Sequence, residues 1–433
     1  MLFRSNTWHR DSTTDMLVAN RIEASSVTMT IGVGGSTVEA ELATMTSMRG
    51  DAPPIGVAEH QQRITRAQTL MRERGIDALW LDISSSLTYF TGLRLRRTER
   101  LHGAVLPVRG DLVYVTPAFE EEALRAMIKF GGTIAVWQEH EDPTARVTET
   151  LRSLGVRNGT VGVDEATPFF SFDGLRRAGN SYNFVNAIAI TGQCRAIKSD
   201  AEIALMQTAK NITLVAQKAA ARILRAGITT TEVQAFIIEA HRRLGASGPP
   251  PFNSVLFGEA TAYPHGVPYP QTLKDSDMVL IDTGAPVDGY LSDITRSYVF
   301  GTPTPRQRQI WNLEKEAQAA GFAAAQVGNR CEDIDAAVRK VIEAAGFGPG
   351  YATPGLPHRT GHGIGLDVHE WPYLVKGDTT ILQPGMTFSN EPTICIYGEF
   401  GVRHEDHMHI TANGPRWFTK PSHTVDDPFG YAT

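Results

Sequence analysis

The stretch DMVLIDTGAPVDGYLSDITRSYVFG, residues 277–301, decides the fold of the second half of this 433-residue chain. Its β-branched and aromatic content and its central Gly-Tyr turn predict a hairpin. Asp282 lies within the apolar strand VLIDTG, and Asp293 lies at the start of the returning strand. An aspartate in a buried strand is costly unless it is paired or binds a metal. The alternative for the two residues is one structural salt bridge and one turn cap.

A second stretch, GMTFSNEPTICIYGEFGVRHEDHMHIT at 385–411, repeats this arrangement. Two apolar strands surround a YGEFG turn, with Glu391 predicted in the first strand and Glu405 in the second. Arg403, Glu405, His407 and His409 share parity, so strand alternation aims their side chains at one face. The alternative for Arg403 and Glu405 is a surface ion pair on an edge strand.

Between these stretches, TGHGIGLDVHE at 360–370 places His362 between two glycines. Glycines allow a backbone to approach a crowded cluster closely. Four carboxylates and one imidazole suit a pair of divalent cations, whereas four acids without cations would be forced to take up protons. The pattern predicts a dinuclear site with His362 as a ligand, at which a water held between the cations becomes the nucleophile.

The helical patterning supports two related halves. A long helix is expected at about 200–225, opened by a capping box of Ser199 and Glu202, and another at about 305–325. Each is followed by a Gly-containing turn, a shorter helix with an acidic start, and strands. We therefore expect two αα-plus-hairpin halves that face each other, with the site between them.

The preceding residues alternate helices and strands, which predicts a separate α/β domain. Its first helix, from residue 58, should end at Gly75, and GAVLPVRGDLVYVT at 103–116 should form a hairpin. The domains are expected at 58–192 and 193–433, after a poorly patterned N-terminal extension at 1–57.

Composition excludes several classes of protein. The net charge of −6 and the absence of a Lys/Arg run argue against a nucleic-acid partner. No secretory signal or apolar run long enough to span a bilayer occurs, so no membrane association is expected. The three cysteines, Cys194, Cys331 and Cys395, have no C-x-x-C spacing, which favours a reducing, cytoplasmic setting.

The motifs LIDTG, SDITR, GHGIGLDVHE, NEP and VRHED resemble the five ligand-bearing motifs of the pita-bread metallopeptidases, in the same order. The resemblance covers about 195–433, and the smaller N-terminal α/β domain is similar to that of the prolidase and aminopeptidase P branch. It implies an α+β pita-bread fold with a creatinase-like N-terminal domain. The ligands that it implies are Asp282 on one metal, Asp293 and Glu405 as bridges, and His362 and Glu391 on the other metal.

The resemblance also implies catalytic roles. Glu391 would be the general base for the bridging water, His265 and His369 would stabilise the tetrahedral intermediate, and Arg403 would orient the surrounding groups and the substrate. The motifs look most like those of bacterial Xaa-Pro dipeptidases, which implies a peptide substrate cut before proline, two divalent cations and a homodimer. Manganese is the first choice of metal, with cobalt or zinc next.

Three other functions stay open: an Xaa-Pro aminopeptidase that trims longer peptides, a creatinase-like hydrolase of other substrates, and a non-catalytic binding module. The chain departs from the family pattern at two positions. Phe252 stands where many prolidases have a tyrosine. His407 stands where relatives commonly have threonine or cysteine, as a residue that tunes the metal or hydrogen-bonds a ligand, or as an inert strand residue.

Overall fold

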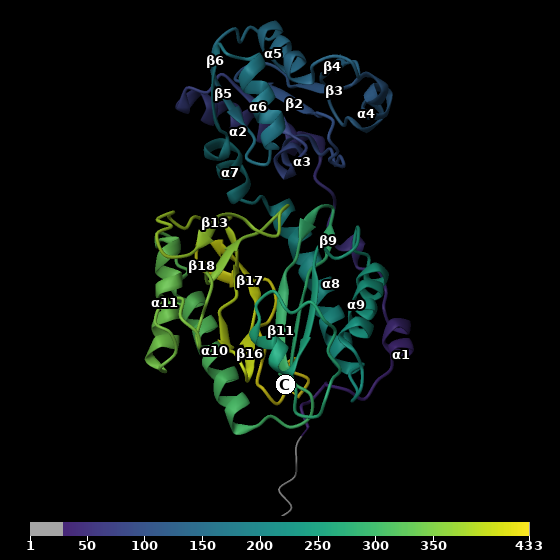
Figure 1. Ribbon diagram of the computed structural model, residues 1–433, viewed down its shortest axis with the longest axis vertical. Coiled ribbons are helices and arrows are strands. Elements are labelled where there is room, and N and C mark those ends of the chain that lie inside the picture. The colour runs from purple at the N-terminus through teal and green to yellow at the C-terminus, as the bar shows by residue number, and fades with distance from the viewer. Residues whose placement is uncertain (1–28, 433) are drawn as a thin grey trace, which may run out of the picture.

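The computed structural model describes residues 29–432. Residues 1–28 of the extension predicted at 1–57 therefore lie outside the described residues. From residue 29 this segment runs along the C-terminal part of the chain (Figure 1). The Thr30 N–H donates to the Gly301 carbonyl, and Val33 is buried in the core there. Helix α1 (Val38–Ala43) packs against α9 (Thr230–Leu244), and the 3₁₀ helix η1 (Arg49–Asp51) follows. Residues 29–56 therefore form a docked arm.

A six-stranded mixed sheet with the order β4-β3-β2-β1-β5-β6 forms the centre of the N-terminal α/β part. The antiparallel β2–β3 pair confirms the predicted hairpin, and the pairs β3–β4, β1–β5 and β5–β6 are parallel. The strands are β1 (Ala78–Asp82), β2 (Gly103–Pro107), β3 (Val113–Pro117), β4 (Thr133–Trp137), β5 (Gly159–Val163) and β6 (Tyr182–Asn186).

Helices cover this sheet. Helix α2 (Val57–Arg74) ends at Gly75, whose φ of 66° is the left-handed conformation that glycine adopts without strain, as predicted. The others are α3 (Ser85–Thr91), η2 (Ala118–Glu120), α4 (Glu121–Met127), α5 (Pro143–Ser153), α6 (Phe169–Ala178) and α7 (Ile188–Ala196). The domain boundary expected after residue 192 lies inside α7, and the division of the chain stays a prediction.

The C-terminal part consists of two halves, each with two helices and an antiparallel sheet, which confirms the predicted α+β repeat. The first half contains α8 (Asp200–Arg222), α9, β7 (Asn253–Phe257), η3 (Gly258–Ala262), β8 (Met278–Thr283) and β11 (Ile294–Val299), with the small ribbon β9 (Pro286–Val287) and β10 (Tyr290–Leu291). Its sheet has the order β11-β8-β7. The capping box of Ser199 and Glu202 that opens α8 is present as predicted.

The second half contains α10 (Pro305–Ala324), α11 (Cys331–Ala344), β12 (Gly361–Gly363), β13 (Glu370–Leu374), β14 (Thr387–Asn390), β17 (Asp406–Thr411) and β18 (Gly414–Trp417). Its sheet has the order β13-β12-β14-β17-β18, and β15 (Thr393–Ile396) and β16 (Phe400–Arg403) form a separate hairpin. Figure 1 shows the strands between the helix pair α8–α9 on one side and α10–α11 on the other.

The two halves meet where β11 lies beside the end of β16. The Glu405 N–H donates to the Thr295 carbonyl at 3.1 Å, and the Ser297 hydroxyl donates to the Arg403 carbonyl at 2.8 Å. Gly401 of β16 allows a second close approach between the halves, to η3, because an added Cβ would lie 2.3 Å from the Thr261 carbonyl oxygen. Segments more than a hundred residues apart are thereby fixed next to each other.

Among residues 29–432, no helix is both long and apolar enough to cross a membrane. All three cysteines belong to the described residues, and each is a buried free thiol.

Candidate metal centre

The two aspartates of the first half converge at one end of its hairpin. Asp282 lies in β8 opposite Thr295 of β11, and Asp293 immediately precedes β11. Asp293 is 4% exposed, and Asp282 lies close enough to help raise the pKa of Asp293, which burial and next the charge of Glu405 raise most. Oδ2 of Asp282 accepts a hydrogen bond from Arg403 at 2.6 Å, which is the salt bridge that the alternative interpretation expected. The pairing occupies only one oxygen, so it does not exclude a second function for Asp282.

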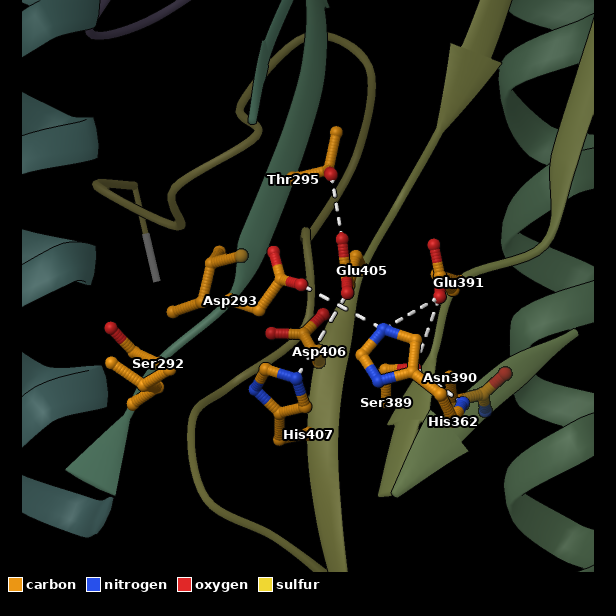
Figure 2. Close-up of polar contacts among 12 residues, drawn as sticks. Ser292, Asp293, Thr295, His362, Ser389, Asn390, Glu391, Glu405, Asp406 and His407 are labelled. Carbon is orange, nitrogen blue, oxygen red and sulfur yellow. Dashed lines mark hydrogen bonds and ion pairs between the residues drawn. The ribbon is translucent and has the colours of Figure 1, made fainter. Parts of the chain in front are cut away.

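His362 lies in the short strand β12, with its ring fixed by its own backbone. Its Nδ1 donates to the Gly363 carbonyl at 3.0 Å, which leaves Nε2 with a free lone pair in the neutral ring. Nε2 lies 3.0 Å from Oε1 of Glu391 and 3.7 Å from Oδ2 of Asp293 (Figure 2). The flanking glycines are sterically required, because an added Cβ at Gly361 would lie 2.2 Å from the Ser389 carbonyl oxygen. His362 is thus aimed at the acids.

Glu391 and Glu405 do not lie within strands, and this part of the sequence prediction is wrong. Glu391 occupies the break between β14 and β15, and Glu405 occupies the break between β16 and β17. Pro392 follows Glu391 and has no N–H to continue the ladder of β14, so the chain leaves one sheet for the β15–β16 hairpin. Both breaks turn the glutamates towards His362 (Figure 2).

The expectation of a surface ion pair on an edge strand is also wrong for Arg403 and Glu405, because they are 3% and 1% exposed. Arg403 instead connects the two halves. Its Nε donates to the Thr295 hydroxyl at 3.0 Å, and the same hydroxyl donates to Oε2 of Glu405 at 2.8 Å. Its remaining terminal nitrogen donates to the Pro264 carbonyl at 3.1 Å. Arg403 therefore holds two acids in position, Asp282 directly and Glu405 through Thr295.

The crowding of acids changes their titration. Burial, and next the charge of Glu405, raise the pKa of Asp293 well above its ordinary value. Burial, and next the charge of Glu391, do the same to the pKa of Glu405. Burial alone would raise the pKa of Glu391 too, but His362, His358 and Arg403 together outweigh burial and lower that pKa to about 2. Such a cluster stays ionised only when positive charge is placed among the acids.

Several buried polar atoms of this cluster have no hydrogen-bond partner among the described residues. Among the five predicted ligand residues, four buried atoms have no hydrogen-bond partner in residues 29–432: Oδ1 of Asp282, Oδ1 of Asp293, Nε2 of His362 and Oε1 of Glu405. Three sets of side chains each bring one donor atom per residue within 4.8 Å of the others: Asp293, His362 and His369; Asp293, Glu405 and His407; His362, Glu391 and Glu405. Oxygen and imidazole donors at this spacing fit divalent cations.

The remaining predicted residues lie at the rim. His369 is exposed, and its ring centre lies 4.1 Å from that of His362. His265 is also exposed, in the loop after η3. Burial, and next the charge of His362, lower the pKa of His369 to about 4, and His265 adds a smaller effect. A cavity of about 110 Å³ adjoins His369 and is lined by both parts of the chain, including Arg195 and Tyr373.

Sequence reasoning missed two residues near the cluster. Nε2 of His358 is hydrogen-bonded to the Thr393 hydroxyl at 3.0 Å. The charge of His358 is one of the causes that lower the pKa of Glu391. The position of His358 four residues before His362 in the same segment is the sequence signal that could have identified it. Lys210 of α8 is fully buried, and its ammonium donates to the Leu291 carbonyl at 3.1 Å. The sequence signal that could have identified Lys210 is a lysine on the otherwise buried face of a helix.

Comparisons with known proteins agree with this architecture. A model described as metallopeptidase family M24 matches residues 204–412, and one described as the Creatinase/Prolidase N-terminal domain matches residues 63–197. The Bacillus subtilis protein named "Putative dipeptidase YkvY" is 33% identical over 353 residues, which are 81% of this chain and 96% of that protein.

Two solved structures are similar over most of their length. Dipeptidase PepE from Mycobacterium ulcerans is 31% identical with a TM-score of 0.80, over 86% of this chain and 99% of that one. The Xaa-Pro dipeptidase from Bacillus anthracis is 28% identical with a TM-score of 0.75, over 84% of this chain and 99% of that one.

Proposed function

The chain belongs to metallopeptidase family M24, and on that premise we propose that it is an Xaa-Pro dipeptidase that hydrolyses the imide bond before proline. Membership of the family implies divalent metal ions and a peptide substrate. The similarity to proteins named as dipeptidases and to a structure named as an Xaa-Pro dipeptidase supports the choice of substrate.

The observation that carries the proposal is the convergence of carboxylate and imidazole atoms that have no partner within the described residues. Five residues would hold two divalent cations in each subunit: Asp282, Asp293, His362, Glu391 and Glu405. Four of the five supply oxygen, so Mn²⁺ is the expected metal, with Co²⁺ or Zn²⁺ next. When bound, such cations polarise a carbonyl and lower the pKa of a water towards neutrality.

Glu391 would move the proton in this reaction. Its Oε1 accepts a hydrogen bond from the Ser389 hydroxyl at 3.1 Å, and its side chain is 14% exposed, compared with 1% for Glu405. It would take a proton from the attacking water and deliver it to the proline nitrogen, which must be protonated to leave.

His265 and His369 lie on the open side of the cluster, where a peptide would enter. Their imidazoles would donate to the oxygen that becomes negative as the carbonyl is attacked. Arg403 would act through Asp282 and Thr295, which it contacts, by holding the acids in place.

A direct test compares Gly-Pro with Gly-Pro-Ala as substrates of the full chain, after incubation with Mn²⁺, Co²⁺ or Zn²⁺. We expect cleavage of the dipeptide, with little cleavage of the tripeptide. Faster cleavage of the tripeptide would make the protein an Xaa-Pro aminopeptidase. Failure to cleave either peptide with any of the three metals would leave a creatinase-like hydrolase or a binding module. A cytoplasmic setting and a homodimer remain predictions.

A further inference from the structure

His407 is a buried histidine next to the proposed metal ligands that the five-residue set leaves unused. It lies in β17, two residues after Glu405, and is 0% exposed. Figure 2 shows its ring turned towards Glu405, on the side of the cluster where Asp293 lies. The family resemblance assigns no role to this side chain, because relatives commonly carry a smaller residue there.

Neither ring nitrogen of His407 has a hydrogen-bond partner among the described residues. A neutral imidazole has one N–H donor and one lone pair, and leaving both unpaired in a fully buried position is costly. Oε1 of Glu405 also has no partner in residues 29–432 and lies 3.9 Å from Nε2 of His407. That distance is too long for a hydrogen bond.

The same distance fits two ligands of one cation. Ligand atoms about 2.0–2.2 Å from a shared ion lie roughly 3–4 Å apart unless they are on opposite sides of it. One donor atom each from Asp293, Glu405 and His407 lies within 4.8 Å of the other two. The other oxygen of Glu405 is held by Thr295, so the free oxygen stays turned towards His407.

The ammonium of Lys210 does not occupy the space between Asp293, Glu405 and His407 in place of a metal cation. Its ammonium donates to the Leu291 carbonyl and lies 4.7 Å from the centre of the Phe418 ring. A neutral ring with a free nitrogen is the form that binds metals.

We propose that His407 is a sixth metal ligand, which supplies a second imidazole, through Nε2, to a cation shared with Asp293 and Glu405. This inference rests on the proposed function, since it requires that the acids bind divalent cations. It has a chemical consequence: a second nitrogen donor favours Co²⁺ and Zn²⁺ over Mn²⁺ relative to a site with one imidazole.

The test uses the full chain stripped of metal and titrated with Co²⁺ by calorimetry, for wild type, His407→Gln and His407→Thr. His409→Gln is the matched control, because His409 lies two residues later on the same strand and contacts Phe418 instead of the acids. We expect the affinity for one of the two Co²⁺ ions to fall about 10–100-fold in both His407 variants and to stay unchanged in the control. The melting temperatures of the metal-free proteins check that the variants are folded.

A second measurement counts the imidazoles that bind Co²⁺ and does not depend on peptide hydrolysis. In the proton NMR spectrum of the Co²⁺ protein, each ligating imidazole gives a strongly shifted exchangeable N–H signal. We expect signals from His362 and His407 in wild type and the loss of one in His407→Gln. A wild type that binds two Co²⁺ ions but shows a single such imidazole, with unchanged affinity in the variants, would overturn the inference alone. A wild type that binds no Co²⁺ would overturn the proposed function as well.

Discussion

The hydroxyl of Thr295 donates a 2.8 Å hydrogen bond to Oε2 of Glu405, a residue 110 positions later in the chain. The same hydroxyl accepts from Nε of Arg403, and Arg403 in turn donates to Asp282. This chain of contacts crosses from the first half of the repeat to the second. It fixes the orientation of two carboxylates that come from different halves of the repeat, those of Asp282 and Glu405.

Thr295→Val should weaken metal binding without unfolding the protein. Valine has nearly the same shape but cannot donate to Glu405, so the carboxylate loses its fixed orientation. Loss of such an outer contact lowers metal affinity by about 10–100-fold. Thr295→Ser keeps the hydroxyl and should bind almost as wild type in the same calorimetric titration. Equal affinities for valine and serine variants would contradict this role.

Glu391→Gln should abolish most turnover. A glutamine cannot accept the proton of the attacking water, and removal of a general base slows a reaction by about 10²–10⁴-fold. The measurement is kcat for Gly-Pro with saturating metal. Glu399→Gln is the matched control, because Glu399 lies in the same region on an exposed turn and pairs with Arg306. A Glu391→Gln enzyme that kept wild-type kcat would show that another group moves the proton.

Arg296→Leu should destabilise the fold. Arg296 forms a 2.6 Å ion pair with Asp406, and the two side chains are 1% and 0% exposed. Removal of one partner leaves a buried charge unpaired, which costs about 3–5 kcal/mol in the free energy of unfolding. The exposed pair of Arg306 and Glu399 provides the contrast, because Arg306→Leu should cost at most about 1 kcal/mol. Urea unfolding of the metal-free proteins measures both values, and similar losses would be inconsistent with this difference in burial.

Asp164 should make stability depend on pH. It is 2% exposed, and burial, followed by the charge of Glu165, raises its pKa to about 7. In an unfolded chain an aspartate titrates near about 3.9. Because the folded state holds this proton more tightly, the stabilisation is complete below about pH 4 and is lost as the pH rises to about 7.

Asp164→Asn removes this titration. Between about pH 4 and 7, the free energy of unfolding of the variant should therefore rise relative to wild type by up to about 1.4 kcal/mol for each pH unit. Urea unfolding at pH 4.5, 5.5 and 6.5 measures the difference. A difference that stays constant over these three values would show that Asp164 titrates normally in the folded protein.

Much of the fold follows from local patterns in the sequence. The left-handed end of α2 at Gly75 and the capping box of Ser199 and Glu202 are decided by a few adjacent residues, so they could be predicted. The strand breaks at Glu391 and Glu405 could not, because they depend on the switch between the sheet of β14 and β17 and the hairpin of β15 and β16. Such a switch is a property of the packed fold.

The candidate site, too, could be predicted from the sequence only in part. Its acids stand out as charged residues within or next to apolar stretches of the sequence, and His362 stands out as a histidine between two glycines. The role of Arg403 depends on the approach of β11 to β16, and the burial of Lys210 depends on how α8 covers the sheet. Residue spacing carries neither kind of information, because both contacts join segments that are far apart in the chain.

The central claim is that acids from both halves bind two divalent cations together. The most direct measurement is the number of Mn²⁺ ions bound by the metal-stripped full chain, together with Gly-Pro hydrolysis, for wild type and Asp293→Asn. Wild type should bind two ions and gain activity as they bind, and Asp293→Asn should lose both metal uptake and turnover. Full activity of metal-stripped Asp293→Asn, or equal Mn²⁺ binding by the two proteins, would contradict the account.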